Sequence, residues 1–431
     1  MNITTEIKRK FYDSLKRGTG EAYLIAKKYS TIDFSNYIIR GALNNFAYDG
    51  QSEDNRARYI FDLIAISNNQ IKIQEAILGG LAKEREDTWS LTHLFALAKL
   101  YAEKGNDKFR QAIYDRFLNN PIEGSDWVGY QEILELDGLN GLIYICEKFG
   151  KVIARNPDEW QDNSIVKHFQ DDNPQMAVLE ELKNRAKSNK YIQLYLDNIE
   201  SSEERRRKNR PKPPIFDNII DEILNSKSFL LFRRRRELRE TELSEIGERL
   251  LIEEETANIE KFLFVFSYHK FPFDSNFILK LAKQKSNSQN SIKEYATYAL
   301  KYLKSDSIRA FALDRISSTR NPAKYTDILI SNYKDGDYEL LARVAKKFKN
   351  EDIIESLAIS YTDIFSSNIT KECKEPLEIL YSKMNCGIHR MVIVEILIKS
   401  NVLPDRIKEE IEFDSYLETR ELIRKTVGNK N

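Results

Sequence analysis

Two clusters of arginine are the residues of this sequence whose type and spacing best suit the binding of a ligand. The first cluster contains Arg205, Arg206, Arg207 and Arg210, and the second contains Arg233, Arg234, Arg235 and Arg236. Because a guanidinium group presents a planar fork of N–H donors, arginine binds carboxylates and phosphates bidentately. The two clusters are therefore the predicted binding residues, for an acidic surface of another protein or for a nucleic-acid backbone.

Each cluster also has a plainer interpretation as a solvated helix face. The arginines would then pair with Glu237, Glu240 and the acidic stretch 242–255, and the neighbouring Phe229 and Phe232 would pack in the core rather than stack on a base. Residues 201–240 hold 12 Lys and Arg against 7 Asp and Glu, a net charge of +5, whereas the whole chain balances 67 against 67. A protein that grips a phosphate backbone with its whole surface should be broadly basic, so nucleic acid is the alternative partner and another protein is the first.

A cysteine–histidine group is the second place where spacing could support chemistry. Cys373, Cys386 and His389 follow the pattern C-x12-C-x2-H. A tetrahedral zinc site requires four nitrogen or sulfur ligands, or three ligands and a water molecule. No further ligand lies near these residues in the sequence, so we predict ordinary packed side chains, no metal and no cofactor. Cys146 lies in the apolar run 142–149 and is predicted to be a core residue.

Histidine is too scarce to point to catalysis. The four residues, His93, His168, His269 and His389, lie outside the known hydrolase, metalloprotease and deaminase motifs. His93 has apolar neighbours at helical spacing and is predicted to be packed, while His269 lies at a helix end, where its positive charge would suit the helix dipole. We predict no catalytic residue, and an enzyme of an unrecognised family remains the third class of function considered.

The composition indicates a helical protein with short connections. Of 431 residues, 41% are hydrophobic and 31% charged, and there are only 16 glycines and 10 prolines. Apolar residues at helical spacing predict helices in segments such as 57–67, 292–303, 308–316 and 325–333, and one or two helices in 127–153. No segment alternates with period two for long enough to predict a strand.

The sequence gives no sign of membrane insertion or secretion. It has no run of eighteen apolar residues and no apolar stretch within Met1–Lys10, so we expect neither a transmembrane helix nor a signal peptide. Three cysteines in such a long chain fit a reducing compartment without structural disulfides. These features predict a cytoplasmic protein whose oligomeric state stays open.

A change of composition marks the predicted domain boundary. Residues 201–214 read SSEERRRKNRPKPP, with no apolar side chain and with prolines at 211, 213 and 214. Because proline is not accommodated inside a helix, we predict a basic linker or loop at 201–215. It would separate an N-terminal helical-repeat half, 1–200, from a C-terminal half, 216–431.

Several short segments resemble the second-helix signature of HEAT repeats, in which a capping residue precedes an apolar residue, an arginine and further apolar residues. The segments are Asp306–Leu313 (DSIRAFAL), Asn290–Ala296 (NSIKEYA), Asp107–Ile113 (DKFRQAI) and Asp414–Leu422 (DSYLETREL). The resemblance implies an all-α fold, an α-solenoid of stacked antiparallel helical hairpins, in two halves. In such arrays the arginine often reaches an aspartate of the next repeat.

The resemblance also implies a class of function. Solenoids of this kind bury a continuous core between repeats and leave a long face for binding peptides, proteins or, less often, nucleic acid. We therefore expect a non-catalytic protein–protein interaction scaffold or adaptor. The alternative is a nucleic-acid-binding helical-repeat protein that uses the basic segment 201–240.

Overall fold

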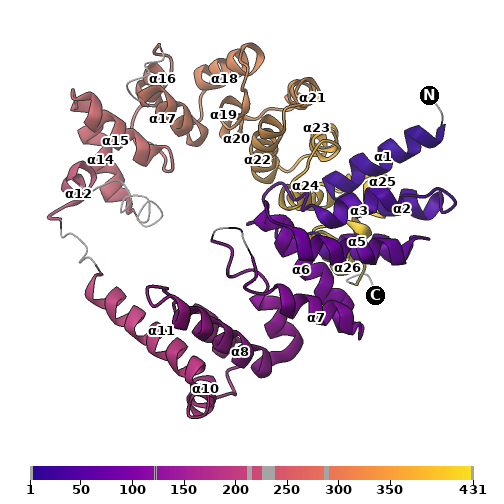
Figure 1. Ribbon diagram of the computed structural model, residues 1–431. Coiled ribbons are helices and arrows are strands. Elements are labelled where there is room, and N and C mark those ends of the chain that lie inside the picture. The colour runs from indigo at the N-terminus through magenta and orange to yellow at the C-terminus, as the bar shows by residue number, and fades with distance from the viewer. Residues whose placement is uncertain are drawn as a thin grey trace. The chain divides into compact units, whose positions relative to one another are not determined.

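The computed structural model describes residues 3–120, 122, 124–210, 216–225, 238–285 and 291–428, with side chains up to residue 422. The described residues form helices joined by turns and loops, and none of them lies in a strand. The predicted all-α class is therefore confirmed. Figure 1 shows the helices following one another in chain order within each part of the chain.

The chain divides into two compact units, each with its own hydrophobic core. Unit 1 contains Met1–Lys212 together with Phe413–Tyr416, and unit 2 contains Pro213–Glu412 together with Leu417–Asn431. The helices of unit 1 are α1 (Ile3–Arg17), α2 (Glu21–Lys28), α3 (Ser35–Leu43), α4 (Ala57–Ala65), α5 (Gln70–Lys83), α6 (Thr88–Glu103), α7 (Asp107–Arg116), α8 (Tyr130–Arg155), α9 (Ser164–Asp172), α10 (Val178–Ala186) and α11 (Lys190–Lys208).

Unit 2 continues the same pattern with shorter elements. Its helices are α12 (Ile219–Asn225), α14 (Glu240–Ile252), α15 (Thr256–Phe266), α16 (Ser275–Ala282), α17 (Ile292–Ala299), η1 (Leu300–Tyr302), α18 (Asp306–Ser318), α19 (Ala323–Thr326), α20 (Leu329–Asn332), α21 (Tyr338–Lys347), α22 (Glu351–Ser367), η2 (Lys371–Cys373), α23 (Lys374–Tyr381), α24 (Gly387–Lys399), α25 (Asp405–Glu410) and α26 (Leu417–Gly428); η3 (Ile411–Phe413) follows α25. No helix among the described residues is long and apolar enough to span a membrane.

Most helices pack on neighbours one or two places away along the chain. In unit 1, α3 packs on α5, α4 on α6 and α6 on α8; in unit 2, α15 packs on α17, α20 on α22 and α22 on α24. This is the contact pattern of stacked helical hairpins, because each helix covers the apolar stripe of the helices before and after it. The packing agrees with a helical-repeat fold, while membership of the HEAT class stays a prediction.

Two glycines shape the end of unit 1. Gly138 has a positive φ of 53° and kinks α8, so the segment predicted to hold one or two helices contains two helical stretches joined at this residue. Further along α8, a Cβ atom on Gly150 would lie 1.9 Å from the carbonyl oxygen of Tyr191 on α11. Glycine at this position therefore permits the close packing of α8 against α11.

The end of α11 corrects one expectation. Residues 201–208, predicted to be part of a linker or loop, instead continue α11 as far as Lys208. Glutamates one turn earlier lie near the basic side chains, with Glu203–Arg207 and Glu204–Lys208 each at 3.9 Å, and Ser202 is buried. Such i,i+4 pairs, together with basic residues in the last turn, stabilise this stretch as a helix although it contains no apolar side chain.

Arginines of two of the quoted segments reach an aspartate in a following helical element. Arg110 of α7 pairs with Asp137 of α8, 27 residues further on. Arg309 of α18 pairs with Asp337, 28 residues further on at the N-terminus of α21, and donates to the carbonyl oxygen of Asn332 at 2.8 Å. The two contacts link successive hairpins in the same way in both units.

The Arg309–Asp337 pair should contribute strongly to the stability of unit 2. The two side chains are only 15% and 8% exposed, so Arg309→Ala would leave a buried carboxylate without its main partner. We expect this change to lower the free energy of unfolding of unit 2 by about 3 kcal/mol, measured by urea denaturation. As a control, Arg343→Ala removes an exposed pair with Glu339 and should cost less than about 1 kcal/mol. Equal losses in the two variants would contradict this account.

His93 is fully buried in α6, as the sequence predicted. Its Nε2 atom lies 3.0 Å from the carbonyl oxygen of Gly41, so this nitrogen carries the proton and donates. Burial lowers the pKa of His93 to about 4. Burial also lowers the pKa of His269, which favours its neutral ring over the positive charge expected at this helix end.

The depressed pKa of His93 predicts a specific loss of stability in acid. Below about pH 6.5 the unfolded chain protonates this histidine while the folded chain does not, so the free energy of unfolding should fall as pH decreases from 6.5 to 4. At about pH 4 this effect should lower the free energy of unfolding by about 3 kcal/mol. The prediction is tested by measuring the unfolding of the native chain and of His93→Gln at several pH values, because the variant should lack this part of the pH dependence. Identical pH profiles would refute the assignment.

Candidate binding groove and the basic end of α11

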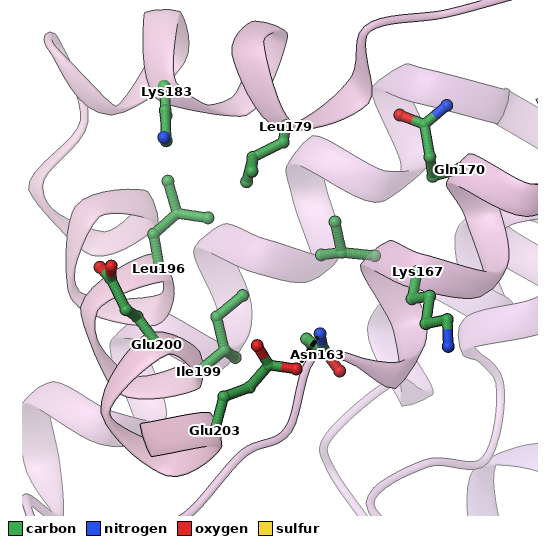
Figure 2. Close-up of a pocket in the computed structure, with 10 residues that line it drawn as sticks. Asn163, Lys167, Gln170, Leu179, Lys183, Leu196, Ile199, Glu200 and Glu203 are labelled. Atoms are coloured by element: carbon green, nitrogen blue, oxygen red, sulfur yellow. Dashed lines mark hydrogen bonds between the residues drawn. The ribbon is translucent and has the colours of Figure 1, made fainter. Parts of the chain in front are cut away.

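An open groove lies between α9, α10 and α11 in unit 1. Its volume is about 340 Å³. Its lining residues come from three helices and the residue before α9: Asn163, Val166, Lys167 and Gln170; Leu179 and Lys183; Leu196, Ile199, Glu200 and Glu203. Figure 2 shows the side chains of Leu179, Leu196 and Ile199 pointing into the same space. The groove is thus apolar along its floor.

The floor differs from the mouth in exposure. Val166, Leu196 and Ile199 are buried and belong to the core of unit 1. Leu179, by contrast, is 46% exposed. Leu179 and the apolar floor together form a continuous apolar surface. A single exposed leucine elsewhere on the protein does not form such a surface.

Charged side chains flank the floor on two sides. Lys167 and Lys183 come from α9 and α10, whereas Glu200 and Glu203 come from α11. Glu203 accepts a hydrogen bond from the side-chain amide of Asn163, which ties α11 to the start of α9. The groove is thus lined by charged side chains of both signs.

Hydrogen bonds between side chains and the backbone fix the walls of the groove. The Gln170 side-chain amide donates to the carbonyl oxygen of Met176 at 2.7 Å and accepts from the backbone N–H of Val178 at 3.0 Å, which holds the connection between α9 and α10. Asn198 of α11 accepts from the backbone N–H of Gln161 and donates to the carbonyl oxygen of Glu159, each at 3.0 Å. The groove is thus preformed rather than created by loose side chains.

The first predicted arginine cluster lies on and just beyond the same helix. Arg205, Arg206 and Arg207 occupy the last turns of α11, Arg210 follows it, and all four are exposed. Arg207 lies near Glu203, and Arg205 donates to the carbonyl oxygen of Ser201 at 3.4 Å. The acidic stretch 242–255 belongs to unit 2, so its pairing with these four residues stays a prediction.

The second predicted cluster, Arg233, Arg234, Arg235 and Arg236, lies outside the described residues, as do Phe229 and Phe232. The acidic residues proposed to pair with it have local roles where they are described. Glu242, for example, accepts from the backbone N–H of Arg239 at 2.8 Å and caps α14. The structure therefore places the first cluster on an exposed helix end, and a binding role for either cluster stays a prediction.

The cysteine–histidine group is rearranged relative to its sequence spacing. Cys146, Cys373 and Cys386 are all free and buried. Cys386 and His389 lie together with Glu355 of α22, a residue that spacing along the chain did not suggest, and Cys373 is not part of this cluster. Hydrogen bonds to Cys386 and Glu355 favour the charged imidazole and raise the pKa of His389 to about 10.

Comparison with known proteins adds no function. A scan against models of protein families finds no match to this chain. A search of curated proteins likewise finds no related sequence. The argument for function therefore depends on the groove and its surroundings.

Substitutions in the groove should separate binding from folding. Leu179→Asp places a carboxylate at a position that is 46% exposed, so we expect a loss of less than about 1 kcal/mol in the free energy of unfolding. Leu196→Asp places the same group where the side chain is 8% exposed, and should cost more than about 3 kcal/mol. Thermal unfolding of both variants measures the difference, and a large loss for Leu179→Asp would show that this side chain belongs to the core instead.

Proposed function

We propose that this chain is a non-catalytic protein-binding module, a scaffold or adaptor, whose groove between α9, α10 and α11 receives a segment of another protein. The observation that carries the proposal is the exposed Leu179 beside a preformed apolar floor. Helix-in-groove recognition uses such a floor for apolar side chains spaced by three or four residues. The three free cysteines support a reducing, cytoplasmic setting for this activity.

The charges near the groove suggest the chemistry of the partner. Lys167 of α9 and Lys183 of α10 line the groove together with Glu200 and Glu203 of α11. Arg205, Arg206 and Arg207 follow Glu203 along α11 and make the surroundings of this end of the groove more basic. An amphipathic helix rich in aspartate and glutamate would bury its apolar stripe on the floor and place carboxylates near these cations. We therefore propose an acidic amphipathic segment as the partner.

The proposal can be tested with labelled peptides of the stated chemistry. Acidic peptides of roughly 20 residues with an apolar stripe at helical spacing should bind the full chain, while scrambled peptides of equal composition should not. Leu179→Glu should weaken binding by at least about tenfold, measured by fluorescence anisotropy. Leu194→Glu is the matched control, since Leu194 is an exposed leucine of α11 that does not line the groove.

Two results would contradict the proposal. One is equal affinity for ordered and scrambled peptides, and the other is an equal loss of affinity in the control variant. Nucleic acid is the competing partner, and the exposed Arg205–Arg210 stretch is the described feature that favours it. The chain would then bind duplex or single-stranded nucleic acid at about 150 mM salt. This binding would weaken steeply with added salt and would be lost on Arg→Glu changes at 233–236. Such a result would identify nucleic acid, and not a protein segment, as the partner.

A further inference from the structure

Three potential metal-binding side chains meet between α22 and α24 in unit 2. The donor atoms of Glu355, Cys386 and His389 all lie within 4.8 Å of one another. Oε2 of Glu355 lies 2.6 Å from Nδ1 of His389, and Oε1 of Glu355 accepts from the backbone N–H of Cys386 at 3.2 Å. The carboxylate therefore reaches both of the other residues.

The local structure holds these side chains in place. Cys386 is the residue before the first turn of α24, and His389 follows three residues later, so both lie on one face of that helix. The loop before α24 is held by Arg390, which is fully buried and donates to the carbonyl oxygen of Asn385 at 2.8 Å. Glu355 comes from the buried face of α22, which packs on α24.

The donor set suits one class of ion. A thiolate, an imidazole and a carboxylate are the three ligand types of zinc, with bonds of about 2.0–2.3 Å. Donor atoms within 4.8 Å of one another would have to move closer together by a small adjustment of their side chains to bind one ion. Thiolate and carboxylate together carry two negative charges, which match a divalent cation. Calcium and magnesium prefer oxygen ligands only, so the sulfur and nitrogen atoms select against them.

Burial argues against a nucleophilic role for the same residues. Cys386 is 4% exposed and Glu355 is buried as well, so an acyl substrate has no path to the sulfur. The side chain of His389 is 25% exposed, so one of the three residues contacts solvent. Zinc held by three protein ligands usually keeps a water molecule as its fourth ligand.

We propose that Glu355, Cys386 and His389 form a zinc site that joins α22 to α24. The site is independent of the groove in unit 1. Binding of zinc would release the Nδ1 proton of His389 and the thiol proton of Cys386 to solvent, and it would replace the direct hydrogen bond between Glu355 and His389 by one bond from each residue to the ion. Because the site is formed only in the folded chain, zinc should also raise the stability of unit 2.

The test uses the full, untagged chain after treatment with a chelator. Titration with Zn²⁺ by calorimetry should give one bound ion per chain. Titration with Co²⁺ should give the visible bands of a tetrahedral ion together with a thiolate-to-metal charge-transfer band. Cys386→Ser should lose the charge-transfer band and bind Zn²⁺ at least about 100-fold more weakly, because loss of a ligand exceeds the 10- to 100-fold effect of losing a supporting residue.

Cys373→Ser is the matched control, because Cys373 is also a buried cysteine of unit 2 but lies outside the cluster. It should keep both the stoichiometry and the Co²⁺ spectrum. The proposal is overturned if the native chain binds no Zn²⁺, or if the Co²⁺ spectrum lacks a thiolate band. It is overturned equally if Cys373→Ser, and not Cys386→Ser, loses the band. The Co²⁺ spectrum of the native chain decides the question even if a variant fails to fold.

Discussion

The structure depends on the burial of each helix's apolar stripe by its neighbours along the chain. Most helices here have fewer than 18 residues, and short helices are marginal in water without tertiary packing. Burial of about 25 cal/mol per Å² of apolar surface supplies the stability that helix propensity alone does not. Since a helix inside the array is covered on both sides, the chain forms extended cores, one in each unit.

The same constraint explains why a groove can exist. Where α9, α10 and α11 meet, Leu196 and Ile199 are buried but Leu179 is 46% exposed. A stacked array thus leaves apolar surface wherever successive helices diverge. Polar contacts such as Arg309–Asp337 and Arg110–Asp137 then fix how successive hairpins are positioned.

Local features of the fold could be predicted from the sequence because they depend on periodicity. The segment 57–67 contains α4, which ends at Ala65, and 308–316 lies within α18, since their apolar spacing is strong. The segment 325–333 instead contains the end of α19 and all of α20, because periodicity does not show where a helix is interrupted. Apolar periodicity does not predict a helix at residues 201–208, because charge pairs rather than apolar side chains support it there.

Sites built from distant residues could not be predicted in this way. Glu355 lies 31 residues before Cys386, and nothing in its own neighbourhood distinguishes it from other helical glutamates. The groove likewise combines side chains from three helices, none of which has an unusual sequence. Only packing reveals which residues converge, so the sequence indicated the arginines of α11 but not the apolar floor beside them.

Hydrogen exchange in the presence of an acidic amphipathic peptide tests the central claim most directly. Amide exchange reports which helices a ligand covers, without any substitution in the chain. The account predicts that the peptide slows exchange in α9, α10 and the second half of α11, and leaves the helices of unit 2 unchanged. Protection confined to other helices, or none at peptide concentrations that saturate binding, would contradict it.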